Sequence, residues 1–257
     1  MLLVGALAPG IGVAAEYDPR AGLYLGLVGG VGSASSASLR QQGGFYLPGP
    51  LGLRVAVDAD GQADQTRVAL GGIHAGYEWG QMRIGQTSWS LQPATELEGL
   101  WMGKHSRQGG LPIEPRVLGT QYVDLPMTAG VLLANAVITF ETPYSRRILP
   151  YLGAGVGLAR LSIKGADSAN PNEPGINHFD SHPQASDTAL ALQFKVGLKG
   201  RLTDHVSVFA EYRYLAINAT QYVFGETLPP HLPTDPWDVS LGRQTYNIVA
   251  VGLQYRF

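Results

Sequence analysis

Residues 188–201 read TALALQFKVGLKGR, and this stretch decides the fold. Every second side chain in it is large and apolar, and the side chains between them are small or polar. One face carries Leu190, Leu192, Phe194, Val196 and Leu198, and the other carries Ala191, Gln193, Lys195, Gly197 and Lys199. Alternation with a period of two predicts a β-strand that has one apolar and one mixed polar face.

Seven further segments repeat this alternation between turn residues, whereas no stretch sustains the period of an amphipathic helix. The eight predicted strands cover roughly 22–33, 67–79, 93–103, 129–141, 150–162, 188–201, 205–215 and 245–257. They are longer than the usual ~5–6 residues of strands in soluble proteins. This length suits a tilted crossing of a lipid bilayer.

The lengths of the gaps between the predicted strands distinguish two kinds of barrel. A soluble barrel of the lipocalin type also alternates, with its apolar face turned inward. Here long and short gaps follow each other strictly, which places every long connection at one end of the barrel. Outer-membrane barrels have this asymmetry. The sequence therefore predicts an all-β, eight-stranded antiparallel up-and-down transmembrane barrel that presents four long extracellular loops.

Composition narrows the possible functions of the 257-residue chain. Its 34 glycines and 15% charged residues favour β-structure over disorder. A formal net charge of −2 gives no basic surface for nucleic acid, so no nucleic-acid partner is expected. The absence of cysteine excludes thiolate metal sites and disulfides. No cofactor is predicted.

The N-terminal residues differ from the rest of the chain. Residues 1–15, MLLVGALAPGIGVAA, are apolar and end in small residues, as the apolar core and cleavage site of a secretory signal peptide do. We therefore expect a signal peptide at 1–15 and a single barrel domain at 16–257, exported through the periplasm.

Three segments resemble small bacterial outer-membrane barrels of the opacity-protein and OmpA/OmpX type. They are Pro150–Gly157, PYLGAGVG, in the fifth strand, Phe209–Tyr214, FAEYRY, in the seventh, and the C-terminal Val249–Phe257. The resemblance implies a bacterial outer-membrane location. It also implies that the last strand is a signal for the barrel-assembly machinery, carried by Val249, Val251, Leu253, Tyr255 and Phe257.

Charged residues on the inward faces form the main candidate site. By parity they are His74, Glu78, Glu96, Glu98, Lys195, Lys199, Glu211, Arg213 and Arg256. Eight strands leave an interior just wide enough for side chains, and unpaired buried charges are costly. We therefore expect a salt-bridged plug, with a narrow ion path or proton relay as the alternative.

Catalytic and metal-binding patterns are weaker. His74 and Glu78 share one strand face without a serine or threonine, so no nucleophile–base set is formed and no enzyme is predicted. In the third long gap, His178, Asp180 and His182 offer two imidazoles and a carboxylate to a divalent metal. The simpler interpretation is that these three residues are polar side chains on a solvent-exposed loop.

The outward surface suggests partners. Arg160 falls on the lipid-facing side at the long-loop end of its strand, where a cation costs little and can bind lipopolysaccharide phosphate. The alternative is that Arg160 only marks where the strand leaves the membrane. The predicted role is structural or adhesive, through loops that meet an unidentified surface partner. A small-solute or ion channel and a lipid-modifying enzyme are the alternatives.

Overall fold

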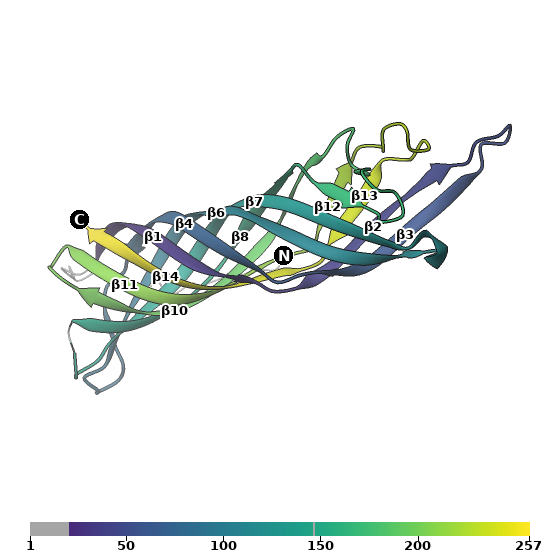
Figure 1. Cartoon of the computed structure of the whole chain (residues 1–257). Coiled ribbons are helices and arrows are strands. Elements are labelled where there is room, and N and C mark those ends of the chain that lie inside the picture. The colour runs from purple at the N-terminus through teal and green to yellow at the C-terminus, as the bar shows by residue number, and fades with distance from the viewer. Residues whose placement is uncertain (1–20, 146) are drawn as a thin grey trace, which may run out of the picture.

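The computed structural model describes residues 21–145 and 147–257 as a closed antiparallel barrel, drawn in Figure 1. The predicted signal peptide lies outside these residues. The eight barrel strands are β1 (Gly22–Ala34), β4 (Thr66–Glu78), β6 (Ser90–Glu114), β7 (Thr120–Glu141), β8 (Ile148–Lys164), β10 (Gln184–Arg201), β11 (Val206–Ile217) and β14 (Gln244–Arg256). The predicted up-and-down barrel and its strand number are confirmed.

The barrel closes where its first and last strands pair. β1 is hydrogen-bonded to β14 with Leu27 opposite Leu253, and on its other side to β4 with Leu27 opposite Ile73. Closure leaves no unpaired edge among the barrel strands, which is the condition for a sheet to cross lipid.

The outward side chains are apolar, as the alternation predicts. Leu27, Ile73, Leu97, Phe194 and Val249 are each between 57% and 63% exposed. In water such a surface would be strongly unfavourable, whereas in a bilayer the acyl chains solvate it. Among the described residues, no helix is long and apolar enough to span a membrane.

Beyond one end of the barrel the sheet continues as a second structure, which we call the extension. It consists of β2 (Ala37–Tyr46), β3 (Arg54–Ala63), β9 (Asp167–Ala169), β12 (Thr220–Phe224), β13 (Trp237–Leu241), residues 105–114 of β6 and residues 120–127 of β7. Its strand order is β12-β13-β2-β3-β6-β7-β9. In Figure 1 these strands project past the end opposite to the C-terminus.

The extension corrects the expected loops. Residues 104–128 are not a loop, because β6 and β7 pair with each other on to Pro112 and Thr120, and the short 3-10 helix η1 (Arg116–Leu118) connects them. The gaps 34–66 and 216–244 likewise contain β2, β3, β12 and β13. A register shift between Met102 and His105 interrupts the alternation in β6. The predicted strand therefore ends at residue 103, although β6 continues beyond it. A bulge there moves the inward side chains from even to odd positions.

The connections at the opposite end are short. Residues 202–204 join β10 to β11, and the two-residue strand β5 (Met82–Arg83) lies in the connection from β4 to β6. The chain therefore places most of its structure outside the barrel at one end and shorter connections at the other.

Candidate functional site

The barrel lumen contains a buried ion network, and four strands contribute its first centre. Lys195 on β10 forms an ion pair with Glu96 on β6 and lies 3.9 Å from a carboxylate oxygen of Glu98. Asn135 on β7 donates through its amide to both carboxylates, at 3.0 Å each. Tyr24 on β1 donates to the other oxygen of Glu96 at 3.0 Å. Each carboxylate is thus held by a cation and by neutral donors.

Arg213 on β11 is the second centre of the network. Its side chain is 1% exposed and lies 2.7 Å from Glu98, while its Nε donates to Glu211. Tyr151 on β8 completes this arrangement by donating to Glu211 at 2.6 Å. Because one guanidinium serves two fully buried carboxylates, its removal would leave Glu211 without a cation and Glu98 with Lys195 alone, at 3.9 Å.

A third pair lies nearer the short-turn end. Lys199 contacts Glu78 at 2.9 Å, and Gln254 donates to the same carboxylate oxygen at 3.3 Å. Arg256 is half-buried at this mouth, where its guanidinium donates to the backbone carbonyl of Asp204 at 2.8 Å. Of the nine predicted lumen residues, Arg256 is therefore the one that borders the lumen rather than filling it.

His74 lies among aromatic rings in the same interior. Its ring centroid is 5.9 Å from that of Tyr24 and 5.6 Å from that of Phe209. Gly26 on β1 makes room for the imidazole, since a Cβ atom there would come within 2.1 Å of its Nε2. Glu78, on the same face of β4, pairs with Lys199, and the cross-strand partner of His74 is Glu98.

The charged layer leaves little free space. Tyr24, Lys195, Lys199 and Arg213 are among the side chains around a cavity of about 20 Å³, which holds roughly one water molecule. A path for hydrated ions would require a continuous column of such space. The arrangement therefore fills this level of the lumen with paired charges.

Above the charged layer the interior becomes apolar. Inward side chains of five strands meet there with exposures of 4% or less: Leu100, Met102, Leu133, Leu161, Ile217 and Ile248. Apolar side chains of the extension continue this core, including Leu39, Leu111, Val123, Leu125 and Val239. Burial raises the pKa of Tyr222 on β12 to about 12, as expected for a phenol in such an interior. Above the charged layer, apolar side chains thus fill the interior of the barrel.

Two loops cover the extension and complete its core. The loop between β9 and β10 contributes Phe179, whose ring stacks on Phe224 with centroids 4.4 Å apart. In the loop between β12 and β13, Thr227 accepts a hydrogen bond from the Trp237 indole at 3.2 Å and donates to the His178 carbonyl at 3.1 Å. We call these two loops the cap.

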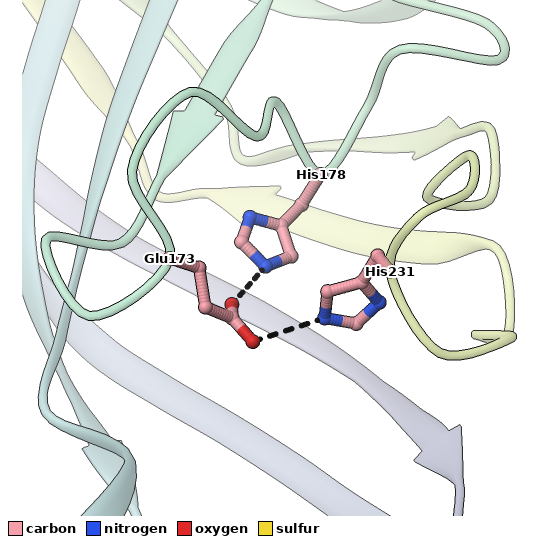
Figure 2. A group of neighbouring side chains, drawn as sticks. All are labelled: Glu173, His178 and His231. Carbon is pink, nitrogen blue, oxygen red and sulfur yellow. Dashed lines mark hydrogen bonds and ion pairs between the residues drawn. The ribbon is translucent and has the colours of Figure 1, made fainter.

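A cluster of three ionisable side chains lies in the cap (Figure 2). Glu173 and His178 come from the β9–β10 loop and His231 from the β12–β13 loop. The Nε2 atom of His178 is 3.0 Å from one oxygen of Glu173, and the Nε2 atom of His231 is 3.2 Å from the other. The side chains of His178 and His231 are 4% and 9% exposed, so the rings are largely shielded from water.

The cluster borders a cavity of about 230 Å³ between the cap and the extension. Phe45, Ile113, Leu118 and Trp237 provide apolar lining, and Asn170, Asn172 and Gln121 provide polar groups. This combination of apolar walls with a few fixed polar groups is typical of small-molecule sites.

The structure groups the histidines differently from the sequence prediction. His178 joins Glu173 and His231, whereas Asp180 accepts a hydrogen bond from the Leu228 amide at 3.0 Å and His182 is exposed. Asp180 and His182 are therefore not members of the group around His178. The predicted motif contained one of the three residues that meet in space.

The sequence matches the family model of the outer membrane protein beta-barrel domain over residues 6–257. The chain belongs to this family. It is a bacterial outer-membrane β-barrel. Barrels of this kind have short periplasmic turns and longer extracellular connections, and this rule assigns the short connections to the periplasm and the extension to the cell exterior. No curated protein matches the sequence significantly.

Several solved structures match most of this chain at low sequence identity. OprG from Pseudomonas aeruginosa is 15% identical, with 93% of this chain and 99% of that chain covered and a TM-score of 0.44. Neisserial surface protein A is 17% identical, with 91% and 97% covered and a TM-score of 0.42. The attachment invasion locus protein of Yersinia pestis is 13% identical, with 91% and 98% covered and a TM-score of 0.28.

The remaining predicted residues lie on the outer wall of this outer-membrane barrel. Val249, Val251, Leu253, Tyr255 and Phe257 all point outward and are between 45% and 67% exposed. Arg160 is exposed near the extracellular end of β8, opposite Thr188 and Gly130 on the neighbouring strands.

Sequence reasoning missed the neutral partners of the charges and two residues of the cap cluster. Tyr24, Asn135 and Tyr151 lie on the predicted inward faces, and strand parity was the available signal for them. Glu173 and His231 lie in separate loops, and neither carries a local pattern that points to His178.

Proposed function

We propose that this protein is a closed outer-membrane scaffold that holds a rigid extracellular β-structure at the cell surface for contact with other molecules. The proposal rests on how side chains fill the interior of the barrel. A paired charged layer fills the periplasmic half of the lumen, and an apolar core runs from there into the extension. A barrel with this interior is suited to support what lies above it.

The channel alternative would need a continuous polar path. The best donors and acceptors of the charged layer are already engaged with each other, as Arg213 is with Glu98 and Glu211. The layer of Leu100, Met102 and Leu133 above them offers an ion no polar ligands. Both layers would have to open together for solute to pass.

Single-channel recording tests the proposal against the channel. The purified, refolded protein is inserted into planar bilayers, and a known porin serves as the positive control for insertion and detection. We expect no discrete current steps, because moving an ion across an apolar layer is strongly unfavourable. Reproducible steps in the wild-type protein would overturn the scaffold proposal and favour the channel.

The enzyme alternative is tested by measuring the mass of lipid A before and after incubation with the protein. We expect no change in that mass.

We further propose that lipopolysaccharide contacts the outer wall at Arg160. Below this residue a groove of about 680 Å³ is lined by Gly71, Gly99, Gly130, Trp101 and Leu158 among others. Cβ atoms added at these glycines would meet nothing within 4 Å except one backbone oxygen at 3.9 Å from Gly71, so the glycines leave the groove open. Its apolar walls suit an acyl chain.

A polar groove lies directly above and shares Arg160. Its lining includes Lys164 and His182, together with Ser162 and Ser186. Basic side chains at the level of the lipid headgroups complement the phosphates of lipopolysaccharide.

For biogenesis, we propose that the barrel-assembly machinery recognises the last strand through Val249, Val251, Leu253, Tyr255 and Phe257.

A further inference from the structure

We propose that Glu173, His178 and His231 form a binding site for a divalent transition-metal ion, with Zn²⁺ preferred, which ties the two cap loops together. The proposal goes beyond the scaffold role, because a barrel can support an extension without binding any metal. Two imidazoles and one carboxylate form a donor set that suits Zn²⁺.

The spacing of the three ligand atoms suits one ion. One nitrogen of each histidine and a carboxylate oxygen all lie within 4.8 Å of one another. The two nitrogen–oxygen separations are 3.0 and 3.2 Å. Ligands at ~2.0–2.1 Å from a tetrahedral Zn²⁺ are about 3.4 Å apart. Small side-chain adjustments therefore suffice for coordination.

Hydrogen bonds fix how both rings present their nitrogens. Nδ1 of His178 is 2.7 Å from the carbonyl oxygen of Ser168, and Nδ1 of His231 is 2.6 Å from that of Leu232. A backbone carbonyl can only accept, so each Nδ1 must carry the proton. Gln121 also contacts Nδ1 of His178, at 2.9 Å, but an amide can present either its oxygen or its nitrogen. In metal sites, hydrogen bonds of this kind, from the ring nitrogen that does not bind the metal, usually orient the histidines.

With both protons on Nδ1, each Nε2 directs a lone pair toward Glu173, as Figure 2 shows for the two rings and the carboxylate. A carboxylate also only accepts hydrogen bonds. The two Nε2 atoms and the carboxylate are thus three acceptors that converge on one point. They need a positive charge, either a cation between them or a proton on a ring. A divalent cation supplies this charge to all three ligands at once.

The surroundings leave room for a fourth ligand. The two rings are buried, whereas Glu173 is 38% exposed and the cavity of about 230 Å³ lies beside it. Zn²⁺ with three protein ligands keeps one position for water or an exogenous donor. The site therefore suits a metal that enters from outside the cell.

A second group of similar composition shows what distinguishes the cap. His74, Glu96 and Glu98 also bring three ligand atoms within 4.8 Å in the lumen. There Lys195 and Arg213 already neutralise the carboxylates. The ion pairs of Glu173 given above involve only the two histidines, and no lysine or arginine lies within 4.0 Å of it among the described residues.

Binding of Zn²⁺ to the whole folded chain tests the proposal. The protein is refolded in detergent micelles without a histidine tag, freed of metal with a chelator, and titrated with ZnCl₂ by calorimetry. We expect one high-affinity site per chain. Glu173→Gln and His231→Ala should each weaken binding at least about tenfold, since changes even in the outer shell of metal sites cost ~10–100-fold. Glu173→Gln retains the side-chain shape, so the cap is expected to stay folded.

His182→Ala is the matched control, because His182 lies in the same loop as His178 but is exposed. It should bind Zn²⁺ as the wild type does. The proposal is overturned if wild type binds no Zn²⁺ at one equivalent, or if Glu173→Gln and His231→Ala bind as tightly as wild type. Equal weakening by His182→Ala would also overturn it, in favour of the local motif. A tetrahedral absorption spectrum of bound Co²⁺ that is lost in Glu173→Gln would support it.

Discussion

The barrel and the extension share strands but invert their polarity. In the barrel, β6 turns Glu98 inward and Leu97 outward, whereas in the extension the same strand turns Leu111 inward and Gln108 outward. The solvent explains the inversion, because lipid accepts the apolar face in the barrel and water accepts the polar face beyond it. Solvent, rather than strand pairing, thus determines which side chains face the interior.

The two interiors also achieve stability differently. Charges in the barrel depend on specific partners, whereas the extension depends on apolar contact that any well-packed neighbour provides. A single substitution should therefore be more harmful in the charged layer than in the extension.

The largest effect is expected for Arg213→Ala. This change leaves Glu98 and Glu211 without their shared guanidinium and should lower the free energy of unfolding by about 3–5 kcal/mol. Urea unfolding in detergent, followed by tryptophan fluorescence, measures the loss. Arg256→Ala at the periplasmic mouth is the control and should cost much less. Similar losses in both variants would contradict the contrast between the filled layer and its border.

A smaller and local effect is expected for Leu111→Ala, whose side chain is 0% exposed in the extension. The loss should be about 2–3 kcal/mol, in the lower part of the usual range, because the extension is free to relax on its solvent side. Hydrogen exchange should show faster opening of β2, β3 and β13 with the barrel strands unaffected. Val117→Ala, at an 85% exposed position, should change nothing. Opening of the barrel together with the extension would break the comparison.

The smallest effect concerns the outer wall. Thermal unfolding in detergent, with and without lipopolysaccharide, compares wild type with Arg160→Ala. We expect lipopolysaccharide to raise the Tm of wild type more than that of Arg160→Ala, by mass action on the folded state. Arg116→Ala, on the exposed tip between β6 and β7, should respond as wild type does. Equal stabilisation of all three proteins would leave Arg160 as a residue at the membrane boundary.

Strand alternation predicted most of the barrel because lipid makes the outward face uniformly apolar. The predicted strand 188–201 falls within β10 (Gln184–Arg201), and 67–79 matches β4 within a residue at each end. The extension was missed since the bulge after Met102 breaks the parity of β6 and since its strands have ordinary lengths among glycines and prolines. Alternation continues in the extension, but its apolar side chains face the interior and its polar side chains face water, so a rule based on an apolar lipid-facing side does not find these strands.

The candidate sites were predictable to different degrees. Parity along a strand placed Glu98 and Arg213 on inward faces, but their pairing depends on the stagger between strands, which the sequence does not display. His178 was recognisable as a possible ligand from its own loop. Glu173 is close to it in sequence, whereas His231 approaches only because β12 and β13 return their loop to the same end of the extension.

The pairing of β1 with β14 has a consequence for the order of folding. Eleven residue pairs join the first strand to the last, from Tyr24–Arg256 to Ala34–Tyr246. These contacts connect opposite ends of the chain and carry the largest loop-closure entropy in the molecule. The seam cannot form until the last strand has been synthesised and delivered. Completion of the barrel is thus slow compared with hairpin formation, and the unsealed edges of β1 and β14 must be shielded during that interval.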